Sequence, residues 1–377
     1  GGQDGGNNAG GGGSGGGSGG DTTPRATPFK AGAARVPLVL PGAVRTGGYG
    51  IFCGRNSGTA RTDSRGRVDT LYTRAVAMRD SEGKTLVMLT GSVIGLFAAY
   101  KAPVGELNDA KRPGLYATRL AISDAVGMPI ENIFVQADHS HFTPDSVGIW
   151  GGATEGQPFN ELLKAYHDSM KAAALEAIAN LEPAALMVGA VDATKVACPS
   201  AIPFCLVNSL YNAPPNVFTD DVFRLIEARR ADNSRIFSWV NYSPHATVLD
   251  DFGDDVALSG DWAGWLAADL DETACTHGAR RCELGLITLA TLGRTDFRNT
   301  RQGTADNDSG PVKNRKREEH ARARLDYFMS LLRNGSTQTG VLPMVALPGD
   351  NRIAVKERLI FETVTQGIFY ANHGPFV

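Results

Sequence analysis

Apolar and polar positions alternate with a period of two in several parts of the chain, a spacing that predicts β-strands. Residues 72–80 alternate in this way and lead through Ser81-Glu82-Gly83-Lys84 into an apolar run over 86–89, so a β-hairpin is predicted there. A second hairpin is predicted from residues 222–228 and 236–240, with its turn at Asp232-Asn233.

Other segments carry the helical spacing of three to four residues, or short continuous apolar runs. Helices are predicted over residues 115–126, 159–181 and 316–332, and buried strands over 133–137, 186–188 and 284–289. Strands and helices that alternate in this way, with two hairpins, predict an α/β protein with mixed sheets and flanking helices. The sequence shows no internal repeat.

Composition and charge argue against a nucleic-acid-binding protein and a membrane-spanning protein. The chain is 42% apolar and 20% charged, with a net charge of −3, which is ordinary for a folded protein and gives no global attraction to nucleic acid. The basic run Lys313-Asn314-Arg315-Lys316-Arg317 precedes two glutamates and is expected to form a solvated helix face. The longest apolar stretch, residues 86–100, is too short and too polar for a transmembrane segment.

The N-terminal residues form a separate unit. Residues 1–27 begin with a glycine-rich stretch that cannot bury a core, so a disordered tether is predicted there and a single α/β domain over 28–377. Such a tether is typical of a processed lipoprotein with an N-terminal lipid anchor, and an engineered linker is the alternative. An exported protein is expected, either a periplasmic or cell-surface lipoprotein or a secreted one.

The cysteines favour the same location. Two local pairs, Cys198 with Cys205 and Cys275 with Cys282, each have six residues between the partners and are candidates for disulfide bonds. Five unrelated buried thiols, including Cys53, are the alternative.

Two histidines follow the strand predicted over residues 133–137. In Asp138-His139-Ser140-His141 the imidazoles are two residues apart on extended backbone, so both project from one face. They can share a metal ion or flank a substrate; two surface histidines without a shared role are the alternative.

Two later strands also end in polar residues. His245 follows the strand over 236–240 and would add a third neutral nitrogen of the kind that zinc prefers, although a structural role is the alternative. The strand over 284–289 leads into a glycine turn with Thr295 and Asp296, where α/β proteins place functional loops. Asp261 lies in Ser259-Gly260-Asp261, a short distance after His245.

These loops, in this order, resemble the neutral (non-lysosomal) ceramidase family over about residues 29–342. The similar segments are Lys30–Val36, Gly47–Gly50, Arg74–Ala77, Asp138–His141, Phe237–Val240 before His245, and Ser259–Asp261. The resemblance implies a ceramidase-like α/β fold and a zinc amidase that acts on a fatty acyl amide. It also implies that His139 and His245 bind zinc (Zn2+) and that His141 contacts the reacting centre.

The sequence departs from the family at several positions. The family's key serine, three residues after a glycine, is replaced by Asp296, so the chain is expected to be a divergent member without the nucleophile. The family's remaining zinc ligands, a glutamate and a tyrosine, come from a later region, and the domain is expected to be truncated at its C-terminus.

The function predicted from these residues is a zinc-dependent hydrolase. Its substrate would be a small or lipid-like acyl amide or ester other than ceramide, attacked by metal-activated water. His141 or Asp296 would move the proton as catalytic residues, and Asp261 and Thr295 would contact substrate. A non-catalytic exported binding or structural protein with the same fold is the alternative. The metallo-β-lactamase pattern is excluded because Phe142-Thr143 follows the two histidines.

Overall fold

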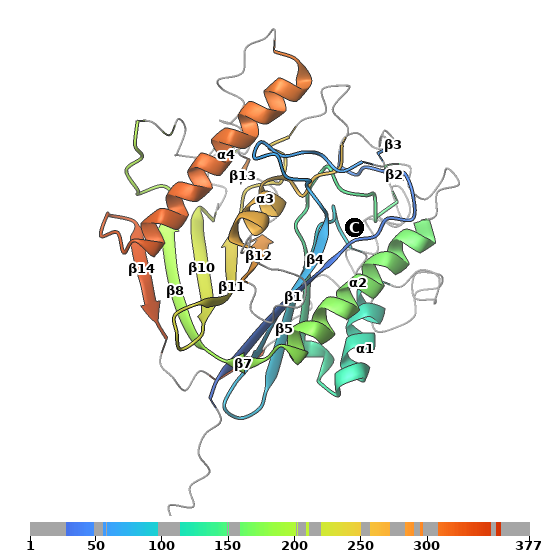
Figure 1. The fold of residues 1–377 in the computed structure, drawn as a ribbon, viewed down its shortest axis with the longest axis vertical. Coiled ribbons are helices and arrows are strands. Elements are labelled where there is room, and N and C mark those ends of the chain that lie inside the picture. Colours follow the sequence, from blue (N-terminus) through green and yellow to red (C-terminus); the bar gives the residue numbers. More distant parts are fainter. Residues whose placement is uncertain are drawn as a thin grey trace, which may run out of the picture.

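Two five-stranded mixed sheets form the centre of the computed structural model (Figure 1). The structure describes residues 28–48, 56–57, 59–96, 114–148, 150, 159–200, 202, 209–210, 220–249, 257–271, 283–289, 295–296, 308–347 and 352–355. The predicted tether over 1–27 lies outside these residues.

The first sheet has the strand order β6-β5-β4-β1-β7. Its strands are β1 (Lys30–Pro37), β4 (Tyr72–Arg79), β5 (Thr85–Gly91), β6 (Ile133–Ala137) and β7 (Glu182–Pro183). Strands β4 and β5 form the first predicted hairpin, and β6 runs parallel to β5. Because β5 and β6 are parallel, their carboxyl ends lie at the same edge of the sheet.

The second sheet has the order β12-β11-β10-β8-β14. Its strands are β8 (Ala185–Asp192), β10 (Val222–Arg229), β11 (Arg235–Tyr242), β12 (Leu284–Leu289) and β14 (Val341–Ala346). Strands β10 and β11 form the second predicted hairpin, and β12 runs parallel to β11. Two-stranded pairs outside the main sheets join β2 (Val44–Arg45) to β3 (Asn56–Ser57) and β9 (Ser209–Leu210) to β13 (Thr295–Asp296).

The two sheets repeat one topology. In the first half of the described chain, three antiparallel strands (β1, β4, β5) are followed by α1 (Leu115–Val126), a parallel strand, α2 (Phe159–Ala179) and a strand that returns beside β1. In the second half, β8, β10 and β11 are followed by α3 (Asp261–Leu270), β12, α4 (Gly310–Arg333) and β14 beside β8. The repeat is one of topology, which explains why the sequence alone does not show it.

Helices cover the outer face of each sheet, so that the architecture has four layers (Figure 1). α2 packs on β1 and β4 of the first sheet, while α3 and α4 pack on the second. Strand β4 is buried on both of its faces. Ala75 and Ala77 face the core beneath α2, and the alternate residues Val76 and Met78 face the second sheet. A strand covered on both faces is apolar at nearly every position.

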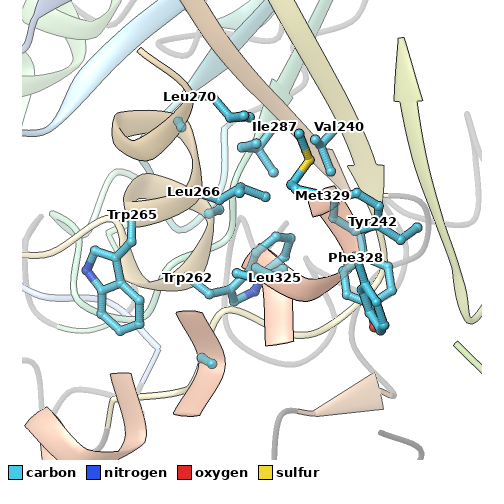
Figure 2. Close-up of a cluster of buried hydrophobic side chains, with 14 of the residues drawn as sticks. Val240, Tyr242, Trp262, Trp265, Leu266, Leu270, Ile287, Leu325, Phe328 and Met329 are labelled. Carbon is cyan, nitrogen blue, oxygen red and sulfur yellow. The ribbon is translucent and has the colours of Figure 1, made fainter. Parts of the chain in front are cut away.

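The hydrophobic core between the second sheet and its helices is built around α3 (Figure 2). Trp262 and Leu266 of α3 pack with Leu325 and Phe328 of α4 over Tyr242 of β11. Tyr242 makes edge-to-face contacts with both Trp262 and Phe328, at centroid distances of 6.0 and 6.1 Å. This core supports the end of β11, after which His245 follows.

Polar contacts also join the two sheets. Arg74 of β4 donates from both terminal nitrogens to the Asp271 carboxylate, at 2.7 and 2.9 Å, and also to the carbonyl of Gly285 in β12. Both Arg74 and Asp271 are buried. The first half is therefore held to the second by a charged contact as well as by apolar packing.

Most predicted elements are confirmed, with one correction in α4. The predicted helix over 316–332 begins earlier, at Gly310. The basic run at its start is not wholly a solvated face: Arg315 is exposed, but Arg317 and the following Glu318 are buried. None of the described helices is both long and apolar enough to cross a membrane.

Candidate functional site

His139 and His141 lie in the turn that leaves β6, next to the segment that leaves β5. Asp138 fixes this turn, because its carboxylate accepts hydrogen bonds from the amides of Val93 (3.0 Å) and Ser140 (3.2 Å). The His139 amide donates to the carbonyl of Val93, and His139 itself has a positive φ of 58°. Burial raises the pKa of Asp138 to about 7, against the effect of these amide hydrogen bonds.

His245 lies in the turn that leaves β11, and two residues of α3 support this turn. The Trp262 indole donates to the carbonyl of Pro244 at 3.1 Å. The Asp261 carboxylate accepts from the amides of Val248 (3.2 Å) and Leu249 (3.0 Å). The loop that carries His245 is therefore held from both sides of the histidine.

Hydrogen bonds tie the two histidine turns together. The Ser140 hydroxyl donates to the carbonyl of Ser259 (2.8 Å), and the Ser259 amide donates to the carbonyl of Phe142 (2.9 Å). The His141 amide donates to the carbonyl of Ala246 at 3.3 Å. These contacts bring residues about a hundred positions apart in sequence to one edge of the fold.

The three imidazoles meet as a cluster. One ring nitrogen from each of His139, His141 and His245 lies within 4.8 Å of the others. Nε2 of His141 and Nε2 of His245 are 2.7 Å apart, and the three ring centroids are separated by 4.6 to 5.3 Å. The structure thus brings together the three histidines that the sequence analysis had selected.

The electrostatics favour neutral imidazoles. Burial lowers the pKa of His139, although its hydrogen bond with the Ile94 carbonyl acts in the opposite direction. Burial, together with the charges of His245 and His139, holds the pKa of His141 well below its usual range. Neutral imidazoles offer lone pairs, which is the form in which histidine binds metals.

One ring is oriented by a backbone carbonyl. Nδ1 of His139 lies 2.6 Å from the carbonyl oxygen of Ile94, so this nitrogen donates and Nε2 keeps the lone pair. Histidines that ligate metals commonly donate their other ring nitrogen in this way. Two facing Nε2 atoms, on His141 and His245, either share one proton or direct their lone pairs at a common cation.

The backbone of Gly48 packs directly against the His141 ring. A Cβ atom at Gly48 would lie 2.3 Å from Cγ of His141, and Gly48 has a φ of 107°. Both the space and the backbone conformation therefore require glycine at this position.

The other predicted site residues are not part of the histidine cluster as far as the structure describes them. Asp261 is fully buried behind the His245 loop, with its carboxylate bonded to backbone amides. Thr295 and Asp296 form β13, opposite Leu210 and Ser209, and the structure describes their backbone only. The substrate-binding and catalytic roles of these three residues stay predictions.

The predicted disulfide pairs fall largely outside the described residues. Cys198 packs against the core of the second sheet, whereas Cys205, Cys275 and Cys282 lie in segments that the structure does not describe. Both pairings stay predictions.

Sequence reasoning missed three supporting residues: Asp138, Gly48 and Asp69. The Asp69 carboxylate is buried, accepts from the Trp265 indole at 2.9 Å and from the Ser259 hydroxyl, and so supports the turn before α3. The role of Asp138 could have been predicted from the local sequence, because an acidic residue lies directly between a buried strand and a histidine. Asp69 and Gly48 act through contacts that no local pattern reveals.

Asp261 gives a pH-dependent prediction for the metal-free protein. Burial raises its pKa from 3.8 to about 7 despite three amide hydrogen bonds, so the folded state binds its proton more tightly than the unfolded state. Its contribution to stability is fully present below about pH 4 and is lost as the pH rises to about 7. Urea unfolding between these pH values is expected to show a steeper loss of stability in wild type than in Asp261→Asn. Parallel pH profiles for the two proteins would contradict this assignment.

Comparisons with known proteins support the fold. No family model and no curated protein matches the chain. Among solved structures, neutral ceramidase from Pseudomonas aeruginosa is similar with a TM-score of 0.56 and 14% identity, over 80% of this chain and 45% of that chain. A ceramidase complexed with C2 gives a TM-score of 0.55 and 14% identity, over 80% and 44%. This chain thus spans less than half of either neighbour. It has a ceramidase-like mixed α/β fold.

Proposed function

We propose that this protein is a metal-dependent hydrolase that cleaves an acyl amide or ester, with zinc held by His139, His141 and His245. The observation that carries the proposal is the cluster of three imidazoles, two of them with lowered pKa values, at one edge of the fold. Three nitrogen donors with a fourth position open is a donor set used by catalytic zinc sites.

The donor set fits zinc in two respects. The hydrogen bond from His139 to the Ile94 carbonyl leaves Nε2 as the metal-binding atom. The approach of Nε2 of His141 to Nε2 of His245 favours a ligand role for His141, in place of the separate catalytic role predicted from the sequence. Held by these three residues, zinc would supply Lewis-acid chemistry of the kind that polarises acyl carbonyls and lowers the pKa of water.

Residues of the chain would orient the reactants and move the proton. The segment after β12 starts at the same sheet edge as the His245 turn, because β12 is parallel to β11. Asp296 follows in that segment and is the proposed general base, with Thr295 as a substrate contact. The ceramidase-like fold favours a lipid-like acyl amide as the substrate class, and the replacement of the family serine by Asp296 favours a substrate other than ceramide.

Zinc content is the first test of this proposal. After equilibrium dialysis against zinc, elemental analysis is expected to find about one zinc per chain in wild type and none in His139→Ala, His141→Ala or His245→Ala. His167→Gln is the matched control, because His167 is also partly buried but pairs with Thr118 at 3.0 Å, outside the cluster. Wild-type protein without zinc, or zinc retained by all three variants, would overturn the site.

Hydrolysis is measured separately on the zinc-loaded protein. Cleavage of fluorogenic acyl amides or esters, lost in Asp296→Asn with zinc retained, would support the catalytic assignment. A protein that binds zinc but cleaves none of these substrates would instead favour the non-catalytic binding protein.

Export is part of the same proposal. It is supported by the glycine-rich N-terminal residues and the two cysteine pairs of the sequence. We propose a cell-surface or periplasmic lipoprotein, or a secreted protein, with disulfides Cys198–Cys205 and Cys275–Cys282. Mass spectrometry of peptides from the unreduced protein would identify these pairs or contradict them.

A further inference from the structure

A cavity of about 510 Å³ lies at the opposite end of the first sheet from the histidine cluster. It is formed by the β4–β5 turn, the C-terminal end of α1 and the last turn of α2, which lie near one another in Figure 1. Strand β5 separates it from the histidine turns by roughly 20 Å, the length of seven extended residues. Its volume is within the range of small-molecule sites.

One wall of the cavity is cationic. Arg79 is anchored by its Nε, which donates to the Thr85 hydroxyl at 2.7 Å, and among the described residues no acceptor meets its two terminal nitrogens. The Lys84 ammonium, on the turn, also has no carboxylate partner among the described residues, whereas its backbone amide donates to the Asp80 carboxylate at 2.8 Å. The acidic lining residue, Glu82, forms an exposed ion pair with Arg352 at 3.3 Å and is not paired with Arg79 or the Lys84 ammonium. The buried Asp80 carboxylate nearby is occupied by the amides of Glu82 and Lys84.

The lining from the ends of α1 and α2 is apolar, and Asn132 adds one amide. Val126, Met128 and Ile178 contribute partly or fully buried side chains to it. Asn132 is 94% buried as a residue and lines the cavity, and no described residue forms a hydrogen bond with its side-chain amide, whose atoms are not fully buried. An accessible amide of this kind can donate a hydrogen bond to a ligand in the cavity.

We propose that this cavity binds a small organic carboxylate with a short apolar chain. The carboxylate would accept from Arg79, Lys84 and the Asn132 amide, since a guanidinium fork matches the two carboxylate oxygens. The apolar chain would lie against Val126 and Met128. The combination of a cationic wall and an apolar wall selects an amphipathic anion over inorganic phosphate, which has no apolar part.

Octanoate is a suitable probe. It is titrated into metal-free protein, so that carboxylate binding to zinc does not contribute, and the Met128 methyl signal is followed by NMR. The Met128 methyl signal is assigned as the one that disappears from the spectrum of the variant Met128→Leu. Octanoate is expected to shift this signal, and the double variant Arg79→Gln, Lys84→Gln is expected to bind at least about tenfold more weakly.

Controls separate the ligand features. Lys164→Gln, which removes an exposed lysine of α2, should bind octanoate as wild type does. The single variant Lys84→Gln, on an exposed turn, should show a smaller loss and serves if the double variant does not fold. The proposal is overturned if octanoate leaves the Met128 signal unchanged, if the double variant binds it with wild-type affinity, or if phosphate or octanol binds there as tightly.

Discussion

Replacement of Glu318 by glutamine is expected to lower the free energy of unfolding by about 3–5 kcal/mol. Glu318 is fully buried in α4 and accepts hydrogen bonds from Ser64, at 2.8 and 2.7 Å, and from Arg322 at 2.8 Å. It also forms an ion pair with Arg61. Burial alone would raise the pKa of Glu318, but Arg61 and these hydrogen bonds hold it below its usual value. Removal of the charge leaves the buried Arg61 guanidinium without its carboxylate.

The adjacent residue provides the control. Glu319 is half-exposed and pairs with Arg315 one helical turn away, at 3.1 Å. Glu319→Gln is expected to change stability by no more than about 0.5 kcal/mol, because exposed pairs of this kind contribute little. Urea unfolding of both variants measures the difference. Equal, small effects would show that the buried network does not hold α4 to the segment before β4.

Replacement of Gly48 by alanine is expected to be the most damaging single methyl addition near the histidine cluster. The new Cβ would lie 2.3 and 2.4 Å from Cγ and Nδ1 of His141, so either the ring or the Gly48 backbone must move. The φ of 107° adds backbone strain. We expect a loss of stability well above 1 kcal/mol and zinc affinity lower by about 10–100-fold, as for other changes behind a ligand.

The variant Gly66→Ala is the control that separates backbone strain from the steric clash with His141. Gly66 also has a positive φ, 78°, but no atom lies within 4 Å of the position of a new Cβ. Its substitution is expected to cost only about 1–2 kcal/mol and to leave zinc affinity unchanged. Unfolding curves and zinc titrations of the two variants test this. Wild-type zinc affinity in Gly48→Ala would contradict the close support of His141 by the backbone.

The elements with a clear period were the ones that sequence reasoning found. Helix α2 and strands β5 and β10 have an apolar pattern that matches their burial, whereas α1 and β6 were found although Leu120 and Phe134 are exposed. Helix α3 was missed because it is apolar almost all round: Trp262, Trp265 and Leu266 are all buried, and such a helix has no polar face to give a period. Strand β14 was missed for the opposite reason, since Leu342 and Val345 are exposed on an edge strand.

The candidate site was predictable as far as its side chains follow strands. His139 and His141 follow β6 of the first sheet and His245 follows β11 of the second, so the pattern placed each histidine at a strand end. That the two sheets bring these ends together was not predictable from the strands themselves. The contacts that position these histidines were not predictable, because Ser259, Gly48 and Trp262 reach them from distant parts of the chain. The basic run in α4 shows the same limit. The sequence predicts a solvated Arg317, which is buried, and the adjacent Glu318 bonds to Arg61 and Ser64, more than 250 positions away, as well as to Arg322.

The repeated topology has a consequence for how the histidine cluster comes into being. His139 and His141 belong to the first half and His245 to the second, and the chain crosses between halves at Ala184. A fragment that ends there would carry two of the imidazoles, and its complement would carry one. The three imidazoles therefore come together only when the two halves pack against each other, as in a site shared between two subunits of a dimer. Formation of the cluster would indicate that the two halves have assembled.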